Sequence, residues 1–317
     1  MGLLGARHRA VRAWADAARA RALAARQLNG TGCDLVLFDS KRQMAEVAAR
    51  LVERALQRAE HAAPAPGPRV LFPTGSTPLG EDGFFAALGR ARAARGARTD
   101  RVRLVSGDEY FGVPQSHKGS FATYLRDRVM APLGMDVGAA LQLDGGVGAA
   151  GAGAECARYE ASLRADNPAL GVLGLGTNGH VAFNDPPSAA ASVTRRLTLT
   201  AGSVAAAQGD FPDMPAAELP TEALSVGLAT LTEAVRHCVV LVVGARKAGI
   251  VAKVLEGGYV GPDCPATQLR GARNFSFFLT RDAAAGLSEG ARAGALACGA
   301  GEGAVDACVD ALLARKA

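Results

Sequence analysis

Short apolar runs alternate with stretches that could form helices along most of this 317-residue chain, and this alternation constrains the fold more than any other feature. Examples of the helix-compatible stretches are 44–56, 84–95 and 247–255. A strand, a helix and a second strand in succession usually form a unit with parallel strands. The pattern therefore predicts an α/β fold with a mainly parallel sheet. The apolar runs themselves are 34–38, 69–72, 101–105, 171–175, 238–243 and 274–279.

The first 33 residues differ in composition from the rest of the chain. They are rich in alanine and arginine, and the sequence Asn29-Gly30-Thr31-Gly32 ends their helix-compatible pattern. Further on, the glycine- and alanine-rich stretch 145–153 is typical of a surface loop, and we find no linker between domains. We therefore expect a helical extension over 1–33, followed over 34–317 by a single domain with a Rossmann-like open sheet and helices on both faces.

Charge and cysteine usage exclude several classes of protein. Residues 1–32 contain six arginines and one aspartate, so they carry the whole net charge of +5, and the remainder is neutral. A neutral body argues against a nucleic-acid partner, and the absence of a run of about 18 apolar residues argues against a membrane span. The six cysteines form no CxxC pair and no metal-ligand spacing with the five histidines. We expect a cytoplasmic protein without a metal or other cofactor, and a homo-oligomer is compatible with these features.

A turn rich in hydroxyls follows the apolar run 69–72. It contains Thr74, Gly75, Ser76 and Thr77, which together offer three hydroxyls, free backbone N–H groups and a small residue for close approach. These groups suit a phosphate, although the spacing is not that of a Walker P-loop. The alternative interpretation is an ordinary strand-to-helix turn capped by a threonine.

Carboxylates follow the next apolar run. Asp108 and Glu109 are adjacent, and successive strand residues point to opposite sides, so at most one of them is expected to face a site. A carboxylate in that position can remove a proton next to a carbonyl group. The alternative is a helix cap or a solvated pair.

A histidine lies in a glycine-bordered turn after the run 171–175. His180 follows Asn178 and Gly179, and Asp185 could orient it or share its proton. Histidine titrates near neutral pH and can move a proton between sugar oxygens, although an isolated histidine is more often structural. Lys247 follows the run 238–243, where a helix N-terminus and an ammonium group would favour an anion. Ligands of parallel sheets bind beyond the carboxyl ends of the strands, so these residues should gather at one edge around a sugar phosphate.

Five motifs together make the chain resemble the glucosamine-6-phosphate deaminase family, within the wider group that includes 6-phosphogluconolactonase. Tyr110 and the pair Phe183-Asn184 favour the deaminase branch, because lactonases usually carry other residues there. The resemblance covers roughly residues 34–290. The motifs are Pro-Thr-Gly-Ser-Thr-Pro at 73–78, Asp-Glu-Tyr at 108–110, Gly-His-Val-Ala-Phe-Asn at 179–184, Ala-Leu-Ser-Val-Gly at 223–227 and Val-Gly-Ala-Arg-Lys-Ala at 243–248.

The resemblance implies a role for each candidate residue. The turn 74–77 would hold the substrate phosphate with help from Lys247. His180 would open the sugar ring, with Asp185 and Asn178 as partners. Asp108 would move a proton from C2 to C1 of the open chain, and the resulting imine would lose ammonia by hydrolysis. The implied substrate is an amino sugar phosphate, and no metal or nucleotide is needed.

Three positions depart from the family pattern. Position 178 is Asn where many members have Asp, and position 185 is Asp where the family has Glu, which shortens that side chain by one methylene. The segment 207–210 lacks an arginine that grips the phosphate in other members. Two other functions are compatible with the residues: a sugar-phosphate isomerase or lactonase that releases no ammonia, and a sugar-phosphate sensor without turnover. The cations that could replace the missing arginine are Arg195, Arg196 and Lys118.

Overall fold

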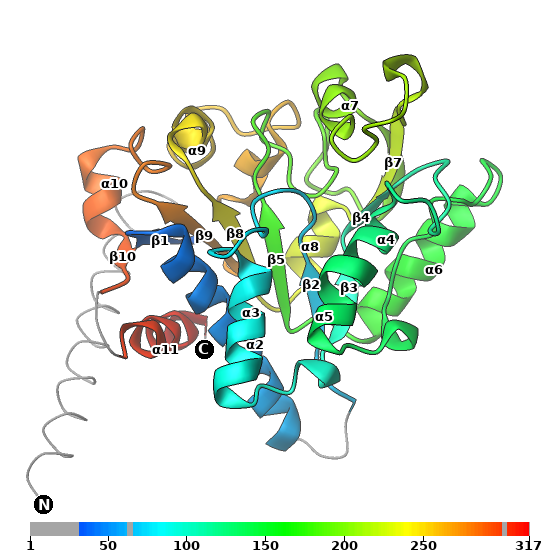
Figure 1. The fold of residues 1–317 in the computed structure, drawn as a ribbon. Coiled ribbons are helices and arrows are strands. Elements are labelled where there is room, and N and C mark those ends of the chain that lie inside the picture. Colours follow the sequence, from blue (N-terminus) through cyan, green and yellow to red (C-terminus); the bar gives the residue numbers. More distant parts are fainter. Residues whose placement is uncertain (1–31, 62–65, 300–302, 317) are drawn as a thin grey trace, which may run out of the picture.

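The computed structural model describes residues 32–61, 66–299 and 303–316, and its centre is a seven-stranded sheet (Figure 1). All neighbouring strands in this sheet run parallel, in the order β10-β1-β9-β8-β5-β2-β3. The predicted mainly parallel α/β fold is therefore confirmed. The helical extension expected over 1–33 lies almost entirely outside the described residues. The strands are β1 (Asp34–Phe38), β2 (Arg69–Phe72), β3 (Arg103–Ser106), β5 (Leu170–Gly174), β8 (Cys238–Val242), β9 (Phe275–Thr280) and β10 (Leu296–Ala297).

Helices cover both faces of this sheet, because successive strand residues point to opposite sides and both sides are apolar. In β5, Val172 packs into one apolar cluster and Leu173 into the other. The first cluster is covered by α2 (Lys41–His61), α3 (Phe84–Arg95), α5 (Ala131–Leu133) and α11 (Ala304–Lys316). The second is covered by α6 (Ala152–Ala165), α8 (Leu228–Ala234), α9 (Ala248–Leu255) and α10 (Glu289–Gly294).

A second, three-stranded sheet was not expected from the sequence. It is antiparallel and consists of β4 (Asp108–Tyr110), β7 (Glu222–Ser225) and β6 (Arg195–Thr198). Tyr110, Phe121 and Phe183 form the centre of its own apolar cluster, between the sheet and the helices α4 (Phe121–Leu125) and α7 (Ala201–Ala207). Only Gly107 separates β3 from β4, so the chain passes directly from the large sheet into the small one next to Asp108.

The six expected strands are all present, with boundaries that differ from expectation mainly at β3. The run 101–105 was expected there, but a 3₁₀ turn occupies Thr99–Arg101 and the strand begins at Arg103. The expected loop at 145–153 ends earlier than predicted, because α6 begins at Ala152. No helix in the described part of the chain is long and apolar enough to cross a membrane.

Candidate active site

A pocket of about 370 Å³ opens beyond the carboxyl ends of β2, β3, β5 and β8, which are neighbours in the sheet. Thr74–Thr77, Asp108, His180 and Lys247 all line it, so the expected gathering of these residues at one edge is what the structure shows. Asn178 and Asp185 do not line the pocket and lie behind His180. They contact one another, and Asn178 also contacts the His180 backbone while Asp185 contacts its imidazole ring.

The hydroxyl-rich turn forms one wall of the pocket. Gly75 has a φ of +85°, a left-handed conformation that favours glycine. Its carbonyl accepts a 2.8 Å hydrogen bond from the Tyr124 hydroxyl, which fixes the turn against α4. Ser76 is exposed and Thr77 is partly buried, so both hydroxyls remain accessible to an anion. The Thr74 hydroxyl differs, because it bonds to the carboxylate of Asp108.

Asp108 is buried at the inner wall of the pocket, with 6% of its surface exposed. Burial raises the pKa of Asp108 to about 7, and the negative charges of Glu109 and Asp210 act in the same direction. Hydrogen bonds from Thr74 and from the backbone at Phe183 limit the rise. A carboxylate with a pKa near neutrality can both accept and return a proton, which is the property required of a general base that works at pH 7.

Glu109 has a structural position and faces away from the pocket. Its carboxylate accepts hydrogen bonds from the Phe121 and Ala122 backbone N–H groups, each 2.9 Å long, and from the Ser120 hydroxyl at 2.6 Å. These donors belong to the first turn of α4 and to the residue before it, so Glu109 caps that helix. The two adjacent carboxylates thus have different environments, as the alternation of side chains along a strand requires.

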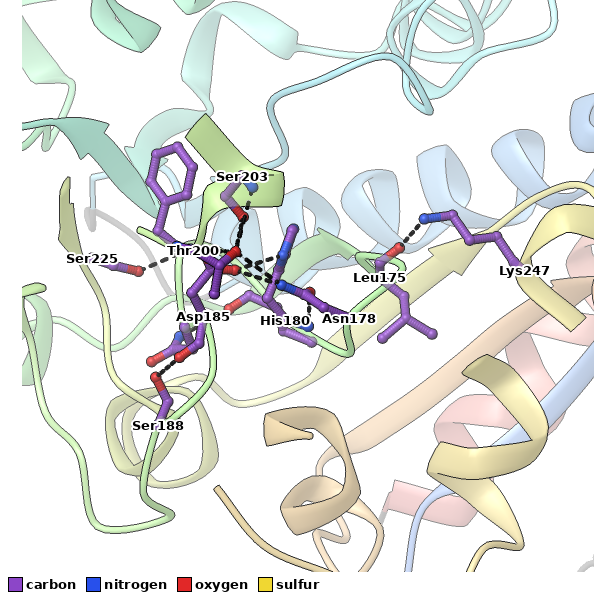
Figure 2. Close-up of polar contacts among 12 residues, drawn as sticks. Leu175, Asn178, His180, Asp185, Ser188, Thr200, Ser203, Ser225 and Lys247 are labelled. Atoms are coloured by element: carbon purple, nitrogen blue, oxygen red, sulfur yellow. Dashed lines mark hydrogen bonds and ion pairs between the residues drawn. The ribbon is translucent and has the colours of Figure 1, made fainter. Parts of the chain in front are cut away.

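His180, in the wall of the pocket, forms a close pair with Asp185 behind it (Figure 2). His180 Nδ1 lies 3.0 Å from Asp185 Oδ1. Burial acts to raise the pKa of Asp185, but hydrogen bonds from His180, Ser203, Thr200 and Asn178 together hold it well below its ordinary value. Because an ionised carboxylate faces Nδ1, the neutral ring keeps its proton there and Nε2 is the basic nitrogen.

Asn178 connects the two members of this pair. Its side-chain oxygen accepts a 3.1 Å hydrogen bond from the His180 backbone N–H, and its Nδ2 donates a 2.9 Å bond to Asp185 Oδ1. An aspartate at this position could not donate to a second carboxylate. The asparagine at 178 is therefore compatible with a carboxylate at 185, because it can donate to one oxygen of Asp185. The other oxygen of Asp185 accepts hydrogen bonds from the Thr200 N–H and hydroxyl.

The backbone around the histidine leaves no room for larger residues. A Cβ atom at Gly176 would lie 2.4 Å from His180 Cε1, so any side chain there would displace the imidazole ring. Ala182 lines the pocket and has a φ of +52°, which is uncommon for a residue with a Cβ atom. Strained residues of this kind concentrate at functional sites.

Lys247 supplies a positive charge at the far side of the pocket. Its Nζ donates a 2.7 Å hydrogen bond to the Leu175 carbonyl, which draws the side chain over the end of β5 (Figure 2). Burial and the neighbouring charge of Arg246 lower its pKa. An anion placed between Lys247 and the turn 74–77 would act to raise the pKa of Lys247 again, because an opposite charge and hydrogen-bond acceptors favour the charged ammonium group.

A second cavity of about 930 Å³ adjoins the pocket and shares Gly75, Ser76 and His180 with it. Lys118, Arg128 and the segment around Gly209 and Asp210 line this cavity. Of the three cations considered from the sequence, only Lys118 therefore lies near the site. Arg195 instead donates to Asn184 and Ser188, and Arg196 pairs with Glu222 and stacks on Phe111.

The candidate residues do not form a cluster that could hold a metal ion. Within the residues that the structure describes, no cluster of three or more histidine, cysteine, aspartate or glutamate side chains is arranged to bind one. The groups that face the pocket are instead hydroxyls, a carboxylate, an imidazole and an ammonium group. This set is suited to proton transfer and to binding an anion.

Comparison with known proteins identifies the family. A family model described as glucosamine-6-phosphate isomerases/6-phosphogluconolactonase matches residues 39–277. The chain belongs to this family. A glucosamine-6-phosphate deaminase of Streptomyces coelicolor is 38% identical over 198 residues, which cover 62% of this chain and 73% of the relative. One of Cutibacterium acnes is 34% identical over 238 residues, or 75% and 85% of the two chains. The solved structure of a monomeric glucosamine-6-phosphate deaminase matches with a TM-score of 0.71 at 25% identity, over 80% of this chain and 100% of that one.

Two residues of this family member were missed from the sequence. Asp210 accepts a 2.8 Å hydrogen bond from the Tyr110 hydroxyl and faces the adjoining cavity, in the segment that lacks the expected arginine. Arg128 lies in a π-helical turn after α4, with its guanidinium 5.5 Å from the centre of the Tyr124 ring. No sequence motif indicates a role for Arg128, whereas the unusual segment 207–210 points to the region of Asp210.

Proposed function

We propose that this protein is a deaminating isomerase that converts a 2-amino-2-deoxyhexose 6-phosphate, such as glucosamine 6-phosphate, to a ketose phosphate and ammonia. The observation that carries the proposal is the combination in one pocket of a buried carboxylate, Asp108, whose pKa is about 7, with an imidazole and an anion-binding turn. The relatives named as glucosamine-6-phosphate deaminases support the choice of substrate. The six free, buried cysteines support a cytoplasmic location.

Ring opening is assigned to His180. Its Nε2 takes the proton of the hydroxyl on C1 and delivers a proton to the ring oxygen, so that the C1–O5 bond breaks and an open-chain aldehyde forms. Asp185, ionised and held by Thr200 and Asn178, stabilises the transient imidazolium. The positive charge of the ring is therefore balanced while the proton is in transit.

Isomerisation is assigned to Asp108. The carboxylate removes the proton from C2, and the electron pair of the broken C–H bond forms a double bond between C1 and C2 while the oxygen on C1 gains a proton. Asp108 then returns its proton to C1, the double bond shifts to C2 and nitrogen, and an imine results. Water adds to the imine carbon and ammonia leaves, which gives the ketose phosphate. A base with a pKa near 7 can perform both transfers at neutral pH.

The 6-phosphate is assigned to the turn Thr74–Thr77 and Lys247. Gly75, Ser76 and Thr77 offer backbone N–H groups and two accessible hydroxyls, and Lys247 adds an ammonium group on the facing wall. Arg128 and Lys118 lie in the adjoining cavity, and Lys118 already pairs with Asp213. In this arrangement one lysine, without an arginine fork, carries the charge that balances the phosphate.

Ammonia release tests the proposal directly. The protein is incubated with glucosamine 6-phosphate, its C2 epimer and 6-phosphogluconolactone, and ammonia, ketose phosphate and free acid are measured separately. We expect ammonia and ketose phosphate in equal amounts, and incorporation of solvent deuterium during turnover. Asp108→Asn should bind the amino sugar phosphate and neither release ammonia nor exchange the C2 hydrogen. Hydrolysis of the lactone without ammonia release would assign the chain to the other branch of its family, and binding without any turnover would indicate a sensor.

A further inference from the structure

A third cavity, of about 410 Å³, lies at the opposite end of the large sheet from the candidate active site, and we call it the rear pocket. It is formed where β2, β3 and β5 begin, beside the C-terminal half of α2, and this is the lower end of the sheet in Figure 1. Its lining contains one acidic residue, Asp166, and a group of five arginines that we call the rear arginines. The rear arginines are Arg54, Arg58, Arg69, Arg103 and Arg236.

Two of the rear arginines are neighbours in the sheet and share a single counter-ion. Arg69 and Arg103 are partners in the register of the parallel strands β2 and β3, where backbones lie about 4.8 Å apart. Like charges in such positions repel. Asp166 Oδ2 lies 3.4 Å from Arg69 Nε and 2.7 Å from an Arg103 terminal nitrogen, so one carboxylate serves two guanidinium groups. This pair of strands therefore leaves one positive charge unbalanced.

Two more rear arginines add to this excess. Arg58 and Arg236 are exposed, and neither forms an ion pair with any residue that the structure describes. Arg54 differs, because it lies 3.0 Å from Asp310. Among the residues that the structure describes, three positive charges of this pocket thus have no carboxylate to balance them. Elsewhere in the described chain, some arginines pair with a carboxylate, such as Arg42 and Arg281, and some exposed ones do not, such as Arg246. The rear pocket differs because it brings several of these charges into one cavity.

The walls of the pocket would strengthen any interaction with an anion. Leu51, Leu170 and Leu313 line it together with Pro66 and Pro68, and these side chains exclude water from one side of the guanidinium groups. Hydrogen bonds between charged groups are stronger where water is excluded. Guanidinium groups also match phosphate oxygens in a two-pronged geometry that an ammonium group cannot provide.

We propose that the rear pocket is a binding site for a small phosphate-bearing anion, separate from the candidate active site and independent of the reaction proposed there. Strand β2 separates the two sites: Arg69 at its start lines the rear pocket, and Phe72 at its end lines the active-site pocket. Three residue steps along a strand span roughly 10 Å. A phosphate bound by Arg58 and Arg236 would lie in front of Arg69 and Arg103. Its negative charge would balance the positive charge that Asp166 alone does not neutralise.

Calorimetric titration with inorganic phosphate tests the site. The double variant Arg58→Gln/Arg236→Gln removes two exposed charges without breaking a described ion pair, so it should fold. The matched control Arg92→Gln/Arg292→Gln also removes two exposed charges without breaking a described ion pair, and both residues lie outside the two pockets. Both pairs are also made in a Lys247→Ala protein, where phosphate binding in the active-site pocket is weakened. A hexose 6-phosphate is titrated in parallel, to distinguish free phosphate from a phosphorylated sugar as the ligand.

We expect phosphate to bind the Lys247→Ala protein, and the rear double variant to weaken that binding at least about tenfold, as loss of charge-assisted contacts normally does. The control pair should leave it unchanged. Phosphate should also raise the unfolding temperature of the parent and control proteins more than that of the rear double variant, because a ligand stabilises only the protein that binds it. Equal phosphate affinity in the rear and control variants would refute the site, and so would loss of all phosphate binding on Lys247→Ala alone.

Discussion

Replacement of Asp108 by asparagine should abolish turnover and at the same time stabilise the fold. The side chain is 6% exposed, and its burial beside Glu109 and Asp210 raises its pKa from 3.8 to about 7. The folded protein therefore holds a proton on Asp108 that the unfolded chain has lost between about pH 4 and 7. Stability from this group is fully present below pH 4 and is lost as the pH rises to 7.

The size of the effect follows from the same shift. About three pH units at 1.36 kcal/mol each give a ceiling of roughly 4 kcal/mol for the cost of the ionised carboxylate above pH 7. Asparagine has nearly the same shape and does not ionise. Its advantage over the parent should therefore be small near pH 4, reach roughly 1–2 kcal/mol at pH 5 and level off at up to about 4 kcal/mol by pH 8.

Denaturant unfolding of both proteins at pH 5, 6 and 8 measures this difference as a change in midpoint at constant slope. Asp82→Asn serves as the control for the same substitution at an exposed position. A gap of the same size at pH 5 and pH 8, or a variant less stable than the parent at pH 8, would contradict the raised pKa. It would also remove the main argument for Asp108 as a base that works near neutral pH.

Four further changes test the remaining parts of the site. Lys247→Ala should raise KM for glucosamine 6-phosphate about ten- to a hundredfold with less effect on kcat, as measured by initial rates. Gly209→Arg should lower KM, because position 209 lines the adjoining cavity and the only atom near its Cβ direction is the Ala206 carbonyl oxygen at 3.5 Å. The pKa of Asp108 is raised mainly by burial, then by the charge of Glu109 and then by that of Asp210. Asp210→Asn removes the last of these, so the acid limb of the kcat/KM profile should move to lower pH. Asp185→Glu should reduce kcat roughly 10²-fold, because the buried carboxylate already has both oxygens paired and an added methylene would shift His180.

The large sheet and the main pocket could be predicted because both depend on local sequence. Each of the six expected strands is a short apolar run, and the polar groups of the pocket lie within a few residues after a strand, as with Phe72 and the turn that follows it. Parallel strands then bring those residues to one edge without further information. The same reasoning predicts that Asp108, His180 and Lys247 line one pocket, as they do.

The small sheet and the adjoining cavity could not be predicted in this way. Strand β4 has only three residues, and it pairs with β7, more than a hundred residues later in the chain. No periodic pattern can develop over such a length. Arg195 and Arg196 bind partners that become neighbours only in the folded chain. The sequence alone therefore could not show that neither arginine reaches the phosphate region. The cap formed by Glu109 is of the same kind, because it depends on where α4 begins.

The site therefore has a closely packed part and a part with free space. Asp108 and the pair of His180 and Asp185 are held by buried hydrogen bonds, and substitution of Gly176 would displace the imidazole. By contrast, Gly209 lines the adjoining cavity and has room for a side chain. A change at position 209 can alter how the phosphate end of a substrate is held and leaves in place the charge of Asp210, which acts on the pKa of Asp108. We therefore expect that substitutions at position 209 will change KM far more than kcat.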